Sequence, residues 1–81
     1  MNERIIKIKN IDPKELFGLR NKNLDFIKSS FPKLKIITRG DEIKVFGDES
    51  LLIEFESKIE IIFNYFLEYN SISENEIETL I

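Results

Sequence analysis

The sequence contains no cysteine and no histidine, and only three glycines and two prolines occur among its 81 residues. The lack of cysteine excludes disulfides, thiolate nucleophiles and cysteine-based zinc or iron–sulfur sites. The lack of histidine excludes imidazole metal ligands and the catalytic pairs in which histidine activates serine or cysteine. We therefore expect neither catalysis nor a resident cofactor in this chain.

Long apolar segments are also lacking. No apolar run approaches the ~18 residues that suggest a membrane span, and residues 1–4 lead directly into a strand-like segment without the features of a signal peptide. We expect a cytoplasmic protein that makes no membrane contact. The apolar content of 42%, with seven phenylalanines, suffices for one small core in a chain of single-domain length.

The charges are divided unevenly along the chain. Residues 1–47 carry eleven basic and six acidic side chains, a net charge of +5, whereas residues 48–81 carry one basic and nine acidic side chains, a net charge of −8. This division predicts a basic surface on one part of the domain and an acidic helix on another. A charge dipole that serves only solubility is the alternative interpretation.

Three segments have the β-branched, partly alternating pattern of strands, at residues 4–9, 34–39 and 42–46. The second and third are joined by so short a glycine-containing link that they predict a β-hairpin. The expected helix-facing positions are Ile6, Ile8, Leu34, Ile36, Ile43 and Val45. The opposite face then carries Ile5, Lys7, Lys9, Lys35, Ile37, Arg39, Lys44 and Phe46. Such a basic face with interspersed apolar residues is unusual for a free-standing monomer.

Two short helices are expected before the second strand. Asp12 is the N-cap of the first, Pro13 occupies its first helical position, and Gly18 ends it. The second carries apolar residues spaced three and four apart, has Asn21 as its expected cap, and stops at Pro32.

Two further helices are expected after the third strand. The long one is capped by Asp48, keeps its apolar residues at the helical period of 3.6, and ends at Asn70. A capping box at residues 73–76 then predicts a final helix from Glu74, whose pattern runs to Ile81 without a stop signal.

The turn between the first two helices resembles the loop of K-homology (KH) domains. Phe17 and Gly18 are followed by two variable residues, then by Asn21 and the apolar helix positions Leu24 and Ile27, which is similar to the KH pattern of Gly-x-x-Gly before an apolar helix. Asn21 stands where the family has its second glycine, and asparagine tolerates left-handed backbone angles better than most residues. In KH domains this loop lets the nucleic-acid backbone approach closely. A plain helix–turn–helix link with solvated cations is the alternative interpretation.

A second resemblance covers nearly the whole chain. Leu16-Phe17-Gly18, Asn23-Leu24, residues 38–43 and Phe46-Gly47-Asp48, followed by a long helix and the capping box, are similar in order to the N-terminal region of PhoH-like proteins. These are P-loop ATPases of the phosphate-starvation-inducible type, in which a KH-like region precedes a RecA-like ATPase domain. The resemblance implies RNA association, with ATP and magnesium bound only in a downstream domain. The chain itself has no Gly-x-x-x-x-Gly-Lys-Ser/Thr motif.

The patterns and the resemblance together predict an α+β fold of KH type I. Helices cover one face of a three-stranded antiparallel sheet, and the third strand lies between the other two. Residues 1–70 are the expected KH-like domain. Residues 71–81 are expected to start a further helix that leads toward the downstream domain.

The predicted function is single-stranded RNA binding without catalysis, by a module of a PhoH-like ATP-binding protein. We expect RNA to contact the turn and a groove lined by Leu16, Leu24 and Ile36. The candidate RNA-binding residues are Gly18, Leu19, Arg20, Asn21, Lys22, Leu24 and Ile36. The alternative function is a protein-interaction or oligomerisation module, in which the sheet or the long helix docks on the ATPase domain or on another subunit.

Overall fold

The computed structural model describes all 81 residues, and its centre is a hairpin of two antiparallel strands. Strands β2 (Lys35–Arg39) and β3 (Glu42–Gly47) pair antiparallel, and β1 (Asn2–Lys7) pairs antiparallel with the other edge of β3. The strand order is therefore β1-β3-β2, as predicted. The first strand lies two residues earlier than expected, because Asn2 pairs with Gly47 and the left-handed Asn10 follows the strand.

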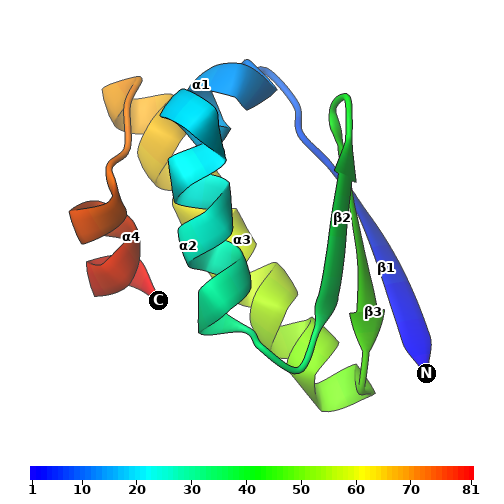
Figure 1. Ribbon diagram of the computed structural model, residues 1–81. Coiled ribbons are helices and arrows are strands. Elements are labelled where there is room, and N and C mark those ends of the chain that lie inside the picture. The colour runs from blue at the N-terminus through cyan, green and yellow to red at the C-terminus, as the bar shows by residue number, and fades with distance from the viewer.

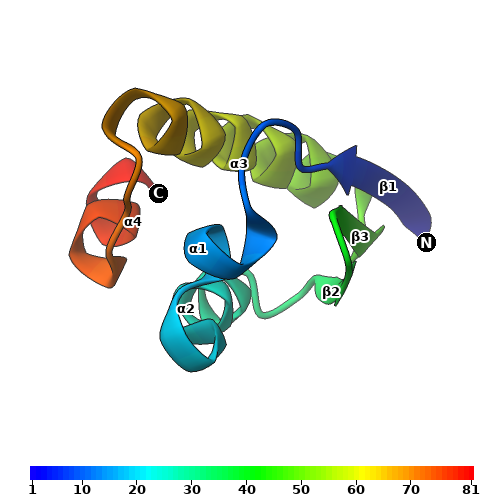
Figure 2. The same cartoon turned by 90° about the horizontal axis from the view of Figure 1, so that it is seen from above.

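The two faces of the sheet differ as the alternation predicts. Ile36, Ile43 and Val45 are buried beneath the helices, whereas Ile6 is only partly buried at the edge of the core. On the opposite face, the register places Lys44 between Ile5 and Ile37. Figure 2 shows that all the helices lie on one side of the sheet, so this outer face is left uncovered.

Helix α1 (Pro13–Phe17) begins as the capping signals predict. The Asp12 side chain accepts a hydrogen bond of 3.0 Å from the amide of Lys14, and Gly18 ends the helix. A 3₁₀ turn, η1 (Leu19–Asn21), leads into α2 (Lys22–Ser30). Helices α1 and α2 lie against each other, and the turn between them is at one end of the molecule (Figure 1).

Helix α3 (Glu49–Tyr69) supplies more buried core residues than any other element. Its 21 residues bury Leu52, Phe55, Ile59, Ile62 and Phe66, at the period expected from the sequence. The ring of Phe55 meets that of Phe31 edge to face, with centroids 5.1 Å apart. Asp48 occupies the predicted N-cap position, although its side chain makes no capping hydrogen bond. No helix is both long enough and apolar enough to cross a membrane.

Helix α4 (Glu74–Leu80) folds back against α2 and α3 (Figure 1). Ile77 is completely buried in the same apolar cluster as the sheet and the other helices, and Ile72, Leu80 and Ile81 lie against that cluster. Residues 71–81 therefore share the core of residues 1–70. The sequence pattern had given no partner for this helix.

The capping box of α4 gives a stability prediction. The Ser73 side chain accepts from the Glu76 amide, and the Glu76 carboxylate accepts from the Ser73 amide at 2.7 Å. We expect Ser73→Ala to lower the free energy of unfolding by about 0.5–2 kcal/mol through loss of the cap, with the fold unchanged. Chemical denaturation measures this, and Ser71→Ala, in the exposed link before the helix, is the control. An equal effect of both changes would contradict the assigned cap.

A second contact of α4 gives a pH prediction. The Tyr65 hydroxyl donates to the Glu76 carboxylate, which lowers the pKa of Glu76 from 4.5 and raises the pKa of Tyr65 to about 12. A carboxyl group whose pKa is lowered by folding stabilises the fold at pH values above its unfolded-state pKa. This contribution is lost as the pH falls through the folded-state pKa. A tyrosine whose pKa is raised by folding stabilises the fold at pH values below its unfolded-state pKa. This contribution is lost as the pH rises through the folded-state pKa.

We therefore expect Tyr65→Phe to lower the unfolding midpoint at neutral pH, with a difference from wild type that shrinks under acidic conditions. Thermal unfolding measured across the pH range tests this. Tyr69→Phe is the matched control, since Tyr69 lies against the Tyr65 ring and makes no side-chain hydrogen bond. A difference that stays constant through the titration range of Glu76 would contradict the contact.

Candidate nucleic-acid interface

The turn between α1 and α2 depends on the backbone of Gly18. Its φ of 82° and ψ of 174° lie in a region that is essentially restricted to glycine. A Cβ atom at this position would also lie 3.0 Å from the side-chain nitrogen Nδ2 of Asn23. The first glycine of the predicted loop is therefore required by both the backbone angles and the available space.

Two further residues of the turn, after Leu19, are also left-handed. Arg20 and Asn21 have φ values of 56° and 59°, and the Asn21 amide donates to the Gly18 carbonyl at 3.0 Å. Asn21 thus takes the conformation that the sequence suggested it would tolerate in place of glycine. It occupies the N-cap position of α2 but makes no side-chain capping bond, which differs from the predicted cap. No side chain therefore caps the first amides of α2.

The side chains of the turn project into solvent. Leu19 is 84% exposed, and Arg20 and Lys22 are also exposed. Lys22 lies 3.7 Å from the Glu74 carboxylate at the start of α4. Arg20 forms no ion pair, so it is the turn's most available cation.

The groove predicted from Leu16, Leu24 and Ile36 is not an open surface. The exposed fractions of these residues are 2%, 4% and 8%, and all three belong to the core cluster. Leu24 and Ile36 are therefore structural residues in this conformation, and they offer almost no area to a ligand. Of the predicted site residues, the structure brings only the five from Gly18 to Lys22 together at the surface.

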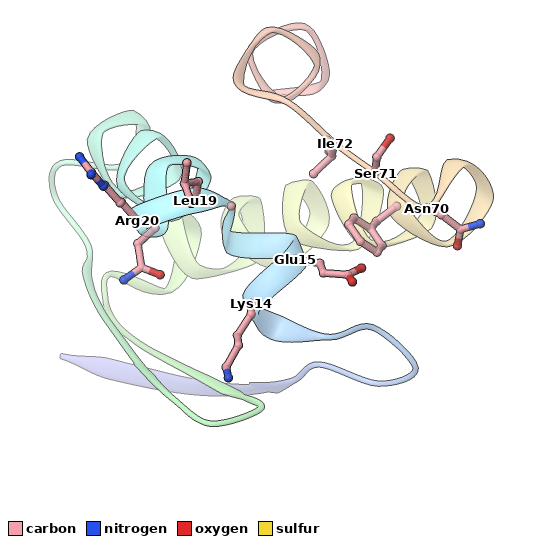
Figure 3. A pocket seen from close by; sticks show the side chains of 10 residues that line it. Lys14, Glu15, Leu19, Arg20, Asn70, Ser71 and Ile72 are labelled. Carbon is pink, nitrogen blue, oxygen red and sulfur yellow. The ribbon is translucent and has the colours of Figure 1, made fainter.

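A wide cavity of about 680 Å³ lies beside the turn. It separates α1 and the turn from the end of α3 and the link to α4. Figure 3 shows Ile72 directed into this space, while Lys14 and Arg20 extend outward from it. The lining residues are Lys14, Glu15, Gly18, Leu19, Arg20, Asn21, Phe66, Asn70, Ser71 and Ile72. The sequence marks residues 70–71 only as a helix end, so their approach to the turn was not predictable.

The side chain of Asn23 connects the turn to two other segments of the chain. It is 6% exposed, and its side-chain nitrogen donates to the carbonyls of Leu16 and Ile72, each at 3.1 Å. One amide thereby joins the end of α1, the start of α2 and the link before α4. Sequence reasoning missed this role. The available signal was a polar residue beside Leu24 on the apolar side of a helix, where buried polar groups require partners.

Comparison of the chain with protein-family models, with curated proteins and with solved structures finds no match in any of the three. No group of three or more histidine, cysteine, aspartate or glutamate side chains is arranged to hold a metal ion. The assignment of this surface therefore depends on its own geometry and charge.

Proposed function

We propose that the chain is a KH-like module that binds single-stranded RNA through residues 18–22. The observation that carries the proposal is the exposed left-handed turn that joins two helices on a sheet of order β1-β3-β2. Gly18 gives the turn its backbone shape, and the Asn23 side chain fills the space that a Cβ at Gly18 would take. Arg20 and Lys22 supply the positive charge that phosphate contacts need.

The proposed contact is mainly with the RNA backbone. The Lys22 amide donates to the Leu19 carbonyl, but no side chain caps the amides that follow it in α2, and such amides are favourable partners for phosphate. The cavity beside the turn gives room for the nucleotide that adjoins the bound phosphate. Because Leu24 and Ile36 are buried, few groups remain to read bases. We therefore expect weak binding that depends strongly on salt and little on sequence.

The test is a salt titration of single-stranded RNA binding by the wild type and by the double variant Arg20→Gln/Lys22→Gln. Loss of two phosphate contacts should weaken binding to any sequence and reduce the slope of log affinity against log salt by about 1.4. Fluorescence anisotropy of a labelled oligonucleotide measures both quantities. Lys28→Gln, an exposed cation in the last turn of α2, is the matched control.

Two further variants make the same test sharper. Glu74→Gln removes the carboxylate that faces Lys22, so it should strengthen binding. Asn21→Gly restores the family's second glycine at a residue that is already left-handed, so it should also strengthen binding by allowing closer approach. If the double variant binds as the wild type does, or if the wild type shows no binding at low salt, the proposal is wrong.

We further propose that this module belongs to a cytoplasmic PhoH-like protein, and that ATP and magnesium bind to another domain of that protein. The order of the segments quoted above supports this. The proposal that the chain is not itself catalytic follows from its lack of a nucleophile–base pair and a phosphate loop. Reading the natural coding frame beyond Ile81 tests the parentage, because a Gly-x-x-x-x-Gly-Lys-Ser/Thr motif should follow.

A further inference from the structure

The outer face of the sheet presents nine side chains in three cross-strand rows. Because each pair of strands is in register, every row contains one residue from β1, one from β3 and one from β2. The rows are Glu3, Phe46 and Lys35, then Ile5, Lys44 and Ile37, then Lys7, Glu42 and Arg39. The face thus has a central lysine between two isoleucines, with one phenylalanine, three further cations and two acids around them.

Two observations indicate that this face lacks a partner. Ile5 and Ile37 are 55% and 40% exposed, although they flank Lys44 at the centre of the sheet. Lys7 is near Asp41 and Glu42, each at 3.7 Å, but Lys35, Arg39 and Lys44 form no ion pair within the chain. The surface therefore combines exposed aliphatic area with uncompensated positive charge.

The solvent face of α3 has the complementary character. Ile53, Ile61 and Leu67 are exposed there, at intervals of eight and six residues. Glu54, Glu60 and Glu68 lie among them, and none forms an ion pair within the chain. The same protein thus exposes an acidic helix face with aliphatic residues and a basic sheet face with aliphatic residues.

We propose that the outer sheet face of one copy binds the solvent face of α3 from a second copy. The dimensions match, because a three-stranded sheet is about 10 Å wide and a helix with its side chains is about 10–12 Å across. Ile53 and Ile61 are about 12 Å apart along the helix. This is close to the distance along β3 from the first to the third row. The unpaired cations would then face Glu54 and Glu60, which lie about 9 Å apart along the helix.

A protein surface fits this sheet better than RNA does. Glu3 and Glu42 lie in the rows on either side of the central row and interrupt the positive charge of the face. Their carboxylates would repel a phosphate backbone that ran along it. Only one aromatic residue, Phe46, is available for stacking on a base. It is partly buried, and the Lys35 amine lies 6.0 Å from its ring centroid. Aliphatic side chains such as Ile5 and Ile37 suit a helix with exposed isoleucine and leucine.

The interface joins two different surfaces of the same chain, so it is head to tail and leaves a free surface at each end. Association should therefore continue beyond a dimer as the concentration rises. The contact is small, and we expect it to be weak and to be lost at high salt. This proposal is independent of RNA binding, because residues 18–22 take no part in it.

Sedimentation velocity of the full chain, free of nucleic acid, over a range of protein and salt concentrations tests the proposal. At low salt, the weight-average mass of the wild type should rise with concentration past that of a dimer. Lys44→Glu on the sheet and Glu60→Lys on α3 should each abolish the rise. An equimolar mixture of the two variants should restore association. The unaltered sheet of the α3 variant can bind the unaltered α3 of the sheet variant, and the two altered surfaces, whose charges are both reversed, can bind each other. Lys28→Glu, away from both faces, should associate as the wild type does.

Each alternative result has a definite meaning. If Lys44→Glu reduces folding, as seen by circular dichroism, Arg39→Glu at the exposed edge strand replaces it. A wild type that stays monomeric at every concentration overturns the proposal. Association that only the sheet variants abolish overturns it in favour of a symmetric sheet-to-sheet dimer. Loss of RNA binding in Lys44→Glu, with no effect on mass, overturns it in favour of RNA on the sheet.

Discussion

Replacing Asn23 with alanine is expected to lower the free energy of unfolding by about 3 kcal/mol. Two hydrogen bonds are lost, and the carbonyls of Leu16 and Ile72 lose the donor that they share. Because a domain of this size has a margin of only about 3–5 kcal/mol, the loss leaves about 0–2 kcal/mol, and a measurable fraction of the variant should be unfolded at physiological temperature. Urea denaturation followed by circular dichroism measures the change.

Asn64→Ala is the matched control for Asn23. Asn64 is also an asparagine within a helix, but it is exposed and makes no side-chain hydrogen bond. Alanine is the better helix former, so this change should stabilise the protein by up to about 0.7 kcal/mol. Similar unfolding curves for the two variants would mean that the Asn23 amide does not connect α1, α2 and the link before α4.

Gly18→Ala should also have a large effect, a loss of about 2–4 kcal/mol. Its backbone angles are those of glycine, and the new methyl group would meet Asn23 Nδ2 at 3.0 Å. Gly40→Ala is the control, since Gly40 has a φ of 59° but nothing within 4 Å of the added carbon. That control should cost only about 1–2 kcal/mol, the ordinary penalty of a left-handed residue.

A double-mutant cycle separates the two causes at Gly18. In the Asn23→Ala background the methyl group no longer meets an amide, so only the backbone cost of Gly18→Ala should remain. We therefore expect the two changes together to cost less than the sum of each alone. Strict additivity would contradict the contact between Gly18 and Asn23, and a neutral Gly18→Ala would contradict the conformation of the turn itself.

The sequence predicted the features that are determined locally. The Asp12 cap, the hairpin at Gly40 and the capping box at Ser73 were all correct, because each depends on residues within four positions of one another. The pairing of Asn2 with Gly47 was not predictable. Nothing near β1 specifies where it meets a partner strand whose paired residues lie 35 to 45 positions further along the chain.

The candidate site was only partly predictable for the same reason. The left-handed Asn21 followed from its residue type, whereas the burial of Leu24 and Ile36 depends on how α2, β2 and α3 pack together. The amide of Asn23 reaches Ile72 across 49 positions of sequence, which no local pattern indicates. The return of α4 to the core depends on Ile77, whose apolar character alone did not identify its partners.

The most direct test of RNA binding at the turn is an amide chemical-shift map. The labelled protein is titrated with a short single-stranded RNA at low salt, and the shift of each backbone amide is followed. RNA binding at the turn predicts the largest changes at residues 18–24, smaller changes around Asn70 and Ser71 at the cavity, and none on the outer sheet face. Changes confined to β1, β2 and β3, or no changes at all, would contradict it.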